Sequence, residues 1–227
     1  MNSLIKLSQI TKSYQAQKKI NILQKINYNF KKGKIYALMG PSGSGKSTLL
    51  NLLSLIDRPT SGFLSFENNR VDFNKPTKND ILRANKIGII YQQDNLLPDF
   101  TSLENIYLAG LAAGKDKIRS VSRAKYLLKK VGLINRSDHY PSELSGGEKQ
   151  RIAIARAIIN DPQIILADEP TGSLDLETAK EIFGIIKSQI NSERIIIFAT
   201  HNRFFANKAD CLLELINGNI APINESL

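Results

Sequence analysis

The chain has 227 residues, of which 42% are apolar and 23% charged, and these proportions exclude a disordered or fibrous protein. Its 31 Lys and Arg outweigh 21 Asp and Glu for a formal net charge of +10. This excess is consistent with binding to nucleic acid or to an anionic membrane surface, or with a Lys-rich solvated surface alone. Because the charges are scattered, the solvated surface is favoured over a dedicated nucleic-acid stripe. One cysteine, Cys211, and two histidines, His139 and His201, exclude an internal disulfide and a multi-His or cysteine-rich metal site.

The apolar stretches are all short. None approaches the roughly 18–20 residues that a membrane-spanning helix requires. The opening residues have neither a long apolar core nor a small-residue cleavage site, so we expect no signal peptide. The length fits one α/β domain, with or without a small lobe. We therefore expect a chain that stays in the cytoplasm.

The predicted elements begin with β structure. Residues 22–30 alternate as in a strand. Ile22, Ile26, Tyr28 and Phe30 fall on one, apolar face, and polar side chains fall on the other. A turn at Lys32-Gly33 leads to a buried strand over 34–39 that runs into a glycine-rich loop. From Lys46 the apolar spacing becomes helical, and residues 58–62, with their proline and glycine, end that helix.

Beyond this helix the sequence predicts a helical insert between regions where strands and helices alternate. Residues 101–160 carry helical spacing, with Gly and Pro only at breaks. Asn217-Gly218-Asn219 predicts a hairpin turn. This order predicts an α/β fold with a mainly parallel sheet, an antiparallel β part and a helical second lobe. The other predicted strands cover 63–67, 86–91, 163–167, 194–199 and 211–216, and the other predicted helices cover 175–190 and 203–208.

The glycine-rich loop matches the phosphate-binding pattern G-x-x-x-x-G-K-[ST]. Its glycines let backbone N–H groups point inward at anionic oxygens, and the following helix adds the positive end of its dipole. Lys46 would place a charge on the β- and γ-phosphates, and the Ser47 hydroxyl is suited to ligate Mg²⁺. The candidate binding residues are Gly40, Pro41, Ser42, Gly43, Ser44, Gly45, Lys46, Ser47 and Thr48.

An acidic pair follows the predicted strand 163–167. Ligands bind at the carboxyl ends of parallel strands, and Asp168 there can hold Mg²⁺ through water. Glu169, one position on, can polarise an attacking water as a general base. An acidic turn is common on surfaces, so this pair alone would be weak evidence for a catalytic site. It indicates one because a phosphate loop precedes it in the chain.

The run Leu144–Arg151 reads LSGGEKQR and opens a predicted helix through Ile159. Ser145 and Glu148 have the spacing of a capping box. Two glycines directly after the cap weaken a helix, and close approach of the backbone to a bound anion explains them better.

Together these motifs resemble those of the ABC ATPases, along essentially the whole chain. The phosphate loop resembles their Walker A motif, IILADE their Walker B motif and LSGGEKQR their signature. Gln92 matches the Q-loop glutamine, Ser173-Leu174-Asp175 the D-loop, and His201 the switch histidine, although Asn202 departs from the acidic residue that usually follows it. Tyr14 lies where the family has an aromatic that stacks on adenine, but an aromatic near a strand end is also a common packing residue.

The resemblance implies a P-loop nucleotide-binding domain with a RecA-like core over about 1–91 and 161–227 and a helical subdomain over about 92–160. ATP and Mg²⁺ are the implied cofactors, with Ser47, Gln92 and Asp168 at the metal. Two copies would pack head to tail, so that Ser145, Gly146 and Gly147 of one copy touch the γ-phosphate held by the other. Glu169 would activate water, His201 would hold the γ-phosphate, Gln92 would sense the metal, and Asp175 would communicate across the homodimer.

Within the family, the stretch Asn95–Asn105 resembles that of the lipoprotein-releasing ATPases. Such a protein lies peripherally on the cytoplasmic face of the inner membrane and serves integral membrane subunits on separate chains, with lipoprotein as the indirect substrate. ATPases of MacB-type efflux and FtsE-type division complexes are the alternatives. A member acting on ribosomes or nucleic acid would usually carry two cassettes or long coiled-coil inserts, so we expect no nucleic-acid partner. A non-hydrolysing scaffold is disfavoured by the full set of Lys46, Asp168, Glu169 and His201.

Overall fold

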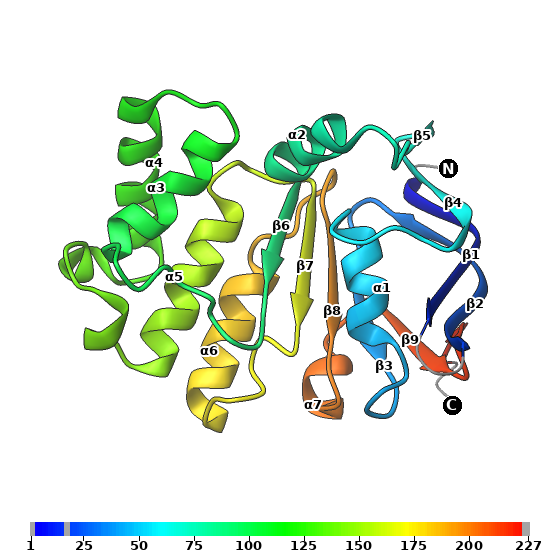
Figure 1. Ribbon diagram of the computed structural model, residues 1–227. Coiled ribbons are helices and arrows are strands. Elements are labelled where there is room, and N and C mark those ends of the chain that lie inside the picture. Colours follow the sequence, from blue (N-terminus) through cyan, green and yellow to red (C-terminus); the bar gives the residue numbers. More distant parts are fainter. Residues whose placement is uncertain (1–2, 16–18, 224–227) are drawn as a thin grey trace. The chain divides into compact units, whose positions relative to one another are not determined.

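The computed structural model describes residues 3–15 and 19–223, and the chain forms two compact units. The first unit comprises Met1–Asp80 together with Ile190–Leu227, and the second comprises Ile81–Gln189. Both units contain strands and helices (Figure 1). The α/β class expected from the sequence is therefore confirmed.

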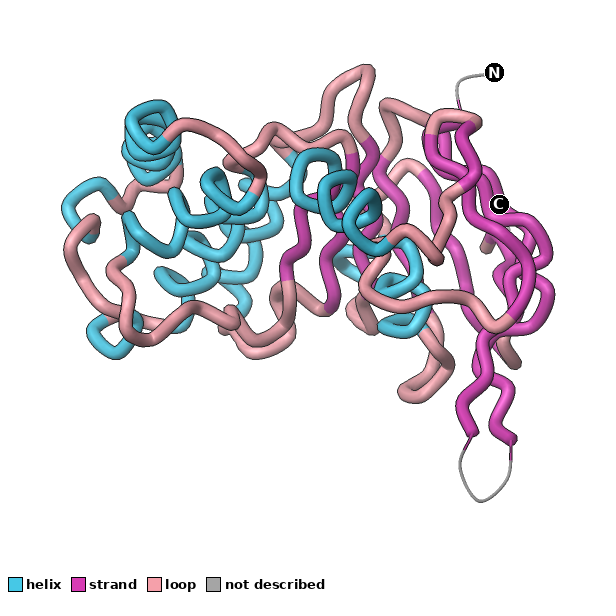
Figure 2. Tube along the Cα trace, turned by 45° about the horizontal axis from the view of Figure 1, so that its top comes forward, coloured by secondary structure: helices cyan, strands magenta, loops and turns pink. Residues whose placement is uncertain are grey.

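The first unit contains an antiparallel sheet with the strand order β2-β1-β4-β5. Strands β1 and β2 pair along most of their length, and Figure 2 shows them side by side. Their inward side chains, among them Leu7, Ile10 and Phe30, are fully buried. The strands are β1 (Ser3–Gln15), β2 (Lys19–Lys31), β4 (Ser61–Phe66) and β5 (Asn69–Arg70).

A bulge interrupts the alternation expected over residues 22–30. The register of β1 against β2 shifts near Lys25, whose φ is 48°. The prediction that Ile22 shares the buried face of Ile26 is therefore wrong, because Leu23 is fully buried and Ile22 only half-buried. An extra residue in one strand moves the side chains before it to the opposite face.

Parallel strands form the other sheet region of the first unit. Strand β3 lies between β8 and β9 and runs parallel to both, whereas β10 pairs antiparallel to β9 across the predicted hairpin turn. All of β8 and most of β3 are buried, as in strands covered on both faces. The elements are β3 (Ile35–Met39), β8 (Ile195–Ala199), β9 (Cys211–Ile216), β10 (Asn219–Pro222) and the helices α1 (Lys46–Leu53) and α7 (Arg203–Ala206).

In the second unit, β6 pairs in parallel with β7, and helix α5 packs against α3, α4, α6 and β6. Figure 1 shows α3, α4 and α5 grouped together, which confirms a mostly helical segment over 101–160. Among the described residues, no helix is both long and apolar enough to cross a bilayer. The elements are β6 (Ile87–Ile90), β7 (Ile164–Asp168), α3 (Ser102–Ala112), α4 (Lys117–Lys130), α5 (Gly146–Ile158), α6 (Leu176–Lys187), η1 (Ile134–Arg136) and η2 (Pro141–Glu143).

Helix α2 (Pro76–Lys86) is absent from the sequence-based predictions. Its composition is polar and Asn79 is its one buried residue, so it has no apolar stripe from which helical periodicity could be read. Weaker signals were present, since proline favours the first helical position and Arg83 and Lys86 suit the last turn.

A buried asparagine organises the loop that precedes α3. Asn105 is 1% exposed, and its Oδ1 accepts from the N–H of Leu97 at 2.7 Å. Its amide nitrogen donates to the carbonyls of Leu97, Phe100 and Thr101 at 3.1, 2.8 and 3.1 Å. Thr101 also forms a capping box with Glu104. Part of the pattern in Asn95–Asn105 is therefore explained by the fold of this loop itself.

We expect Asn105→Ala to lower the free energy of unfolding by about 2–3 kcal/mol, because it leaves buried backbone groups without partners. Asn85→Ala, which removes one side-chain bond to the Ile81 carbonyl, should change it by less than about 0.5 kcal/mol. Urea denaturation of both variants measures the difference. Equal stabilities would contradict the role assigned to Asn105.

Candidate functional site

The phosphate loop, residues 40–48, runs from β3 into α1 within the first unit. Four leucines on the inner face of α1 are buried. The helix begins at Lys46, as the motif predicts, and its N-cap is Gly45 with a φ of 103°. A Cβ at this position would lie 2.7 Å from Cγ2 of Ile22 on β2. Only glycine combines this conformation with this close approach.

The N-terminus of α1 differs from those of four other helices. Side chains of Thr101, Asp116, Ser145 and Asp175 accept hydrogen bonds from the first turns of α3, α4, α5 and α6. Gly45 has no side chain with which to do so, and the first turn of α1 holds no acidic residue. The N–H groups and the positive dipole end of α1 are therefore suited to an external anion.

Lys46 adds a full positive charge at this helix end. Its ammonium donates to the carbonyls of Gly40 and Pro41 at 2.8 and 3.0 Å, which holds the half-buried side chain back along the loop. The Ser47 hydroxyl follows on an exposed residue. The loop therefore presents a cation, a hydroxyl and backbone donors together, which is the set that a phosphate chain with Mg²⁺ requires.

His201 lies beside the start of the phosphate loop. It follows β8 and shares with Gly40 and Pro41 the lining of a pocket of about 380 Å³, which Arg203 and Glu214 also border. Asn202 caps α7, because its Oδ1 accepts from the N–H of Phe204 at 2.9 Å. Asn202 therefore caps the helix, although it replaces the acidic residue that is usual at this position.

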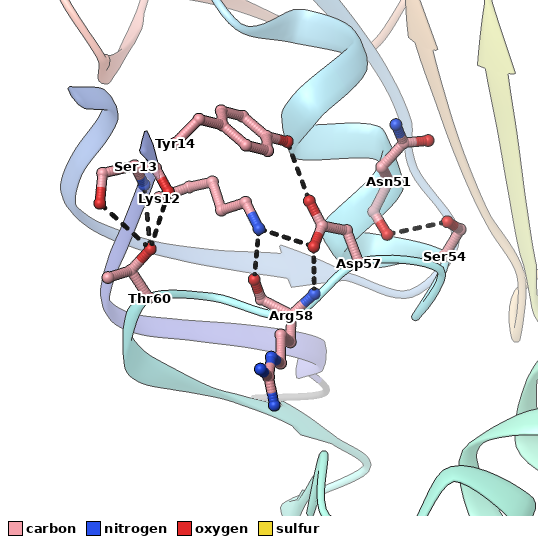
Figure 3. Close-up of polar contacts among 8 residues, drawn as sticks. All are labelled: Lys12, Ser13, Tyr14, Asn51, Ser54, Asp57, Arg58 and Thr60. Carbon is pink, nitrogen blue, oxygen red and sulfur yellow. Dashed lines mark hydrogen bonds and ion pairs between the residues drawn. The ribbon is translucent and has the colours of Figure 1, made fainter. Parts of the chain in front are cut away.

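Tyr14 lies at the end of β1, with its side chain 42% exposed. Its hydroxyl donates to Oδ2 of Asp57 at 2.9 Å, and the Lys12 ammonium lies 4.7 Å from its ring centroid (Figure 3). Burial, and then the hydrogen bond and charge of Asp57, raise the pKa of Tyr14, whereas the Thr48 side chain acts in the opposite direction. The ring is therefore exposed to solvent, but its orientation is restrained by Asp57 and Lys12.

In the second unit, β7 ends in Asp168, which is half-buried. Glu169 follows with a φ of 46°, a left-handed conformation that is costly for a non-glycine residue and recurs at functional sites. Its carbonyl accepts from the N–H of Gly172 at 3.0 Å. A Cβ on Gly172 would lie 3.1 Å from Nε2 of Gln92. The structure therefore brings Gln92 next to the turn that follows Glu169.

The signature segment opens α5 with the predicted capping box. Ser145 N–H donates to Glu148 at 2.9 Å, and Glu148 N–H donates to the Ser145 hydroxyl at 3.3 Å. Gly147 also has an internal reason to be glycine, because a Cβ there would lie 2.6 Å from Cγ2 of Thr178 on α6. Gly146 meets only an ordinary contact and is exposed, as is Asp175, which caps α6. Gly146 thus remains the glycine that external contact would explain.

One residue of the signature segment was missed by the sequence analysis. Gln150 is 3% exposed, and its Nε2 donates to the carbonyls of Tyr91 and Pro170, both at 3.0 Å. These carbonyls directly precede Gln92 and directly follow Glu169. Gln150 therefore fixes the signature helix to both segments, and its one sequence signal was a polar residue beside the apolar face of a helix.

The structure thus gathers the candidate residues into one set in each unit. The first set combines the phosphate loop with Tyr14 and His201. The second combines Gln92, Asp168 and Glu169 with the signature glycines and Asp175. For Mg²⁺, which takes oxygen ligands and keeps several waters, the Ser47 hydroxyl, the Asp168 carboxylate and the Gln92 amide oxygen have suitable chemistry.

Comparison with known proteins identifies one family. The model of the ABC transporter family matches residues 23–172. The lipoprotein-releasing system ATP-binding protein LolD of Rickettsia bellii is 41% identical over 96% of this chain and 97% of its own length. LolD of Wigglesworthia glossinidia brevipalpis is 43% identical over 97% of each protein. The uncharacterized ABC transporter ATP-binding protein YknY of Bacillus subtilis is 40% identical over 96% of each.

Solved structures give the same picture. A dimeric post-hydrolysis state of the ATP-binding cassette MJ0796, bound to ADP and Pi, is similar with a TM-score of 0.85 and 35% identity over 97% of this chain and 99% of that one. Another dimeric structure of MJ0796, a bacterial ABC transporter cassette, has a TM-score of 0.85 and 37% identity over 95% and 96%.

The capping box of α5 predicts a pH-dependent stability. The Ser145 N–H is the largest cause of the lowered pKa of Glu148. Burial opposes it, and the Ser145 hydroxyl and the Arg136 guanidinium reinforce it. A carboxylate with a depressed pKa stabilises the fold above its unfolded pKa, about 4.3, and loses this contribution as the pH falls through its folded pKa.

We therefore expect Glu148→Gln to be less stable than the unmodified chain at pH 6–7, and the difference to shrink below about pH 4. Denaturation at a series of pH values measures it, with Asp99→Asn as a control for the loss of one exposed charge in the same unit. A difference that stays constant down to pH 3 would contradict this assignment.

Proposed function

The chain belongs to the ABC transporter family as an ATP-binding subunit, and on this premise we propose that it hydrolyses ATP to power release of lipoproteins from the inner membrane toward a periplasmic carrier. The observation that carries the proposal is the identity of 41–43% to lipoprotein-releasing ATPases over nearly the whole chain. The phosphate loop, with its uncapped helix and Lys46, supports the ATP-binding part.

Binding of ATP would rest on the first unit. The N–H groups at the start of α1 and the Lys46 ammonium hold the β- and γ-phosphates, and Tyr14 offers an aromatic face to the base. His201 fixes the γ-phosphate, in keeping with its place beside Gly40 and Pro41. The Lys46 ammonium would then exchange the carbonyls of Gly40 and Pro41 for phosphate oxygens.

Hydrolysis would rest on Glu169. A carboxylate at the carboxyl end of a buried strand can accept a proton from the attacking water, and the left-handed backbone at Glu169 redirects it from the strand. Ser47, Asp168 and Gln92 would hold Mg²⁺, which neutralises charge that develops on the phosphates. The bond from Gln150 to Pro170 limits movement of the segment that follows the base.

A second copy of the chain would complete each site. Ser145 and Gly146 are exposed at the N-terminus of α5, and this helix end would meet the γ-phosphate held by the other copy. Asp175, exposed at the start of α6, would face the same partner. The proposal is supported by the two MJ0796 cassettes, which are described as dimeric.

The membrane component would come from separate integral membrane subunits. The loop organised by Asn105 lies directly after Gln92 in the chain, and we assign it to contact with those subunits. The chain would then lie on the cytoplasmic face of the inner membrane. MacB-type efflux and FtsE-type division complexes use related subunits, so the membrane partner decides between these functions.

We expect Glu169→Gln to bind ATP with an affinity within about threefold of the unmodified chain and to lose at least about a hundredfold in turnover, because only the proton acceptor is removed. Binding is measured by calorimetry, and phosphate release is measured in the full transporter complex. Glu177→Gln, an exposed charge change on α6, should leave turnover within about twofold. Unchanged hydrolysis in Glu169→Gln would refute its assignment as the base.

The second test is purification of the tagged chain from native membranes, with mass spectrometry of bound proteins. We expect a pair of inner-membrane subunits with large periplasmic domains, together with lipoprotein. An efflux or division membrane protein in their place would overturn the substrate while leaving the ATPase assignment intact. Ribosomal or nucleic-acid partners would overturn the transporter function altogether.

A further inference from the structure

We propose that Lys12 and Asp57 form a bracket that holds the Tyr14 ring in position for the nucleotide base and joins it to the helix that binds the phosphates. The inference rests on the proposed ATP-binding function. It assigns positioning roles to two residues that lie outside the nucleotide-binding motifs. All the residues concerned belong to the first unit, and Figure 3 shows the polar contacts among them.

The exposed ring of Tyr14 has a fixed orientation. Tyr14 is 42% exposed, and an aromatic side chain with that exposure would ordinarily sample several rotamers. The hydrogen bond from its hydroxyl to Asp57, at 2.9 Å, fixes the far end of the side chain. Since a tyrosine has two χ angles, one bond at the hydroxyl restrains both and removes much of the entropy cost of stacking on a ligand.

The Asp57 carboxylate is itself held in place. Its Oδ1 accepts from the Lys12 ammonium at 2.6 Å and from the N–H of Arg58 at 2.7 Å. Lys12 is 7% exposed and also donates to the Arg58 carbonyl at 2.9 Å. A buried ammonium cannot leave its carboxylate without becoming an unpaired buried charge. Both oxygens of Asp57 are thus engaged, and Tyr14 is bound to a fixed acceptor.

The protonation states suit this arrangement. Although burial raises the pKa of Asp57, hydrogen bonds from Lys12, Tyr14 and Arg58 outweigh it, and the pKa lies below its usual range. The pKa of Tyr14 is raised, as described above. The carboxylate therefore stays charged and the phenol stays a donor at neutral pH, so the bond does not depend on a titration near pH 7.

Lys12 also determines which face of the ring is open. Its ammonium lies 4.7 Å from the ring centroid, so one face of the tyrosine carries a cation. A purine can therefore stack only on the opposite face. The bracket thus sets both the direction of the ring and the side from which a base approaches.

The bracket is built onto the end of the phosphate-binding helix. After α1 ends at Leu53, the N–H of Asp57 donates to the Asn51 carbonyl at 3.1 Å. The β1 side is fastened as well, because the N–H of Ser13 donates to the Thr60 hydroxyl at 3.0 Å. The phosphate-binding end and the base-binding ring are consequently attached to the two ends of one helix, a geometry that favours ligands carrying both groups at the right separation.

The alternative is that the bracket only fastens β1 to α1, with no effect on ligand recognition. The two roles differ in their response to a ligand that has phosphates but no base. Inorganic triphosphate with Mg²⁺ tests the phosphate loop alone, whereas Mg-ADP tests the loop and the ring together. If the bracket positions the ring, the variants lose affinity for Mg-ADP only. If it merely fastens β1 to α1, they lose affinity for both ligands equally or for neither.

The experiment measures dissociation constants of both ligands by calorimetry on the full chain. We expect Tyr14→Phe, which keeps the ring and the Lys12–Asp57 pair, to weaken Mg-ADP binding about 5- to 10-fold, because binding must then order a ring that the hydrogen bond no longer restrains. Asp57→Asn should weaken it similarly. The double variant should be no weaker than either single variant, because both remove the same restraint. The dissociation constant of triphosphate should change by less than about twofold.

Glu193→Gln is the matched control, because it removes a carboxylate from the exposed ion pair with Lys32 in the same unit. Unchanged Mg-ADP affinity in Tyr14→Phe, or equal losses for Mg-ADP and triphosphate, would overturn the bracket. If Asp57→Asn fails to fold, Tyr14→Phe decides alone. Absence of Mg-ADP binding in the unmodified chain would instead refute the proposed function.

Discussion

The constraint on which the first unit depends is the uncapped start of α1. A helix whose first turn lacks a side-chain acceptor keeps its N–H groups and dipole for an external anion. The surrounding structure holds that helix end in place: β3 is buried, Ile22 of β2 closes against Gly45, and loop carbonyls hold the Lys46 ammonium. His201 and Tyr14 approach the same loop from β8 and β1. Phosphate binding thus depends on one helix terminus that no side chain caps.

In the second unit, hydrogen bonds between polar side chains and the backbone place the short functional segments. Gln150 holds the backbone that precedes Gln92 and the backbone that follows Glu169. Asn105 shapes the loop before α3, and the Ser145–Glu148 box caps the start of the signature helix. Each of these bonds replaces water at a backbone group, so losing one partner leaves the other unsatisfied. Rigid placement of a base and of a helix end suits chemistry that depends on positioning.

The features that the sequence predicts correctly depend on residues close together in the chain, whereas the features that it does not predict depend on a partner strand or helix. Residues a few positions apart determine the phosphate loop, the start of α1 and the capping box at Ser145, so these features can be recognised in the sequence. The bulge near Lys25 depends on pairing with β1, and therefore the burial of Leu23 in place of Ile22 was not predictable. Helix α2 lacks an apolar stripe. Gln150 was missed because its partners are backbone carbonyls distant in sequence, and the contact of Gly147 with Thr178 shows that a motif glycine can serve packing too.

The most direct test of the account is the oligomeric state of the chain with and without nucleotide. We expect Glu169→Gln to be a monomer without nucleotide and a dimer with saturating Mg-ATP, because the signature helix of each copy would close on the phosphates held by the other. Sedimentation velocity at several protein concentrations measures this, with a Lys46→Ala, Glu169→Gln double variant as the control that stays monomeric. A Glu169→Gln chain that binds Mg-ATP and yet remains monomeric at every concentration would contradict the shared site.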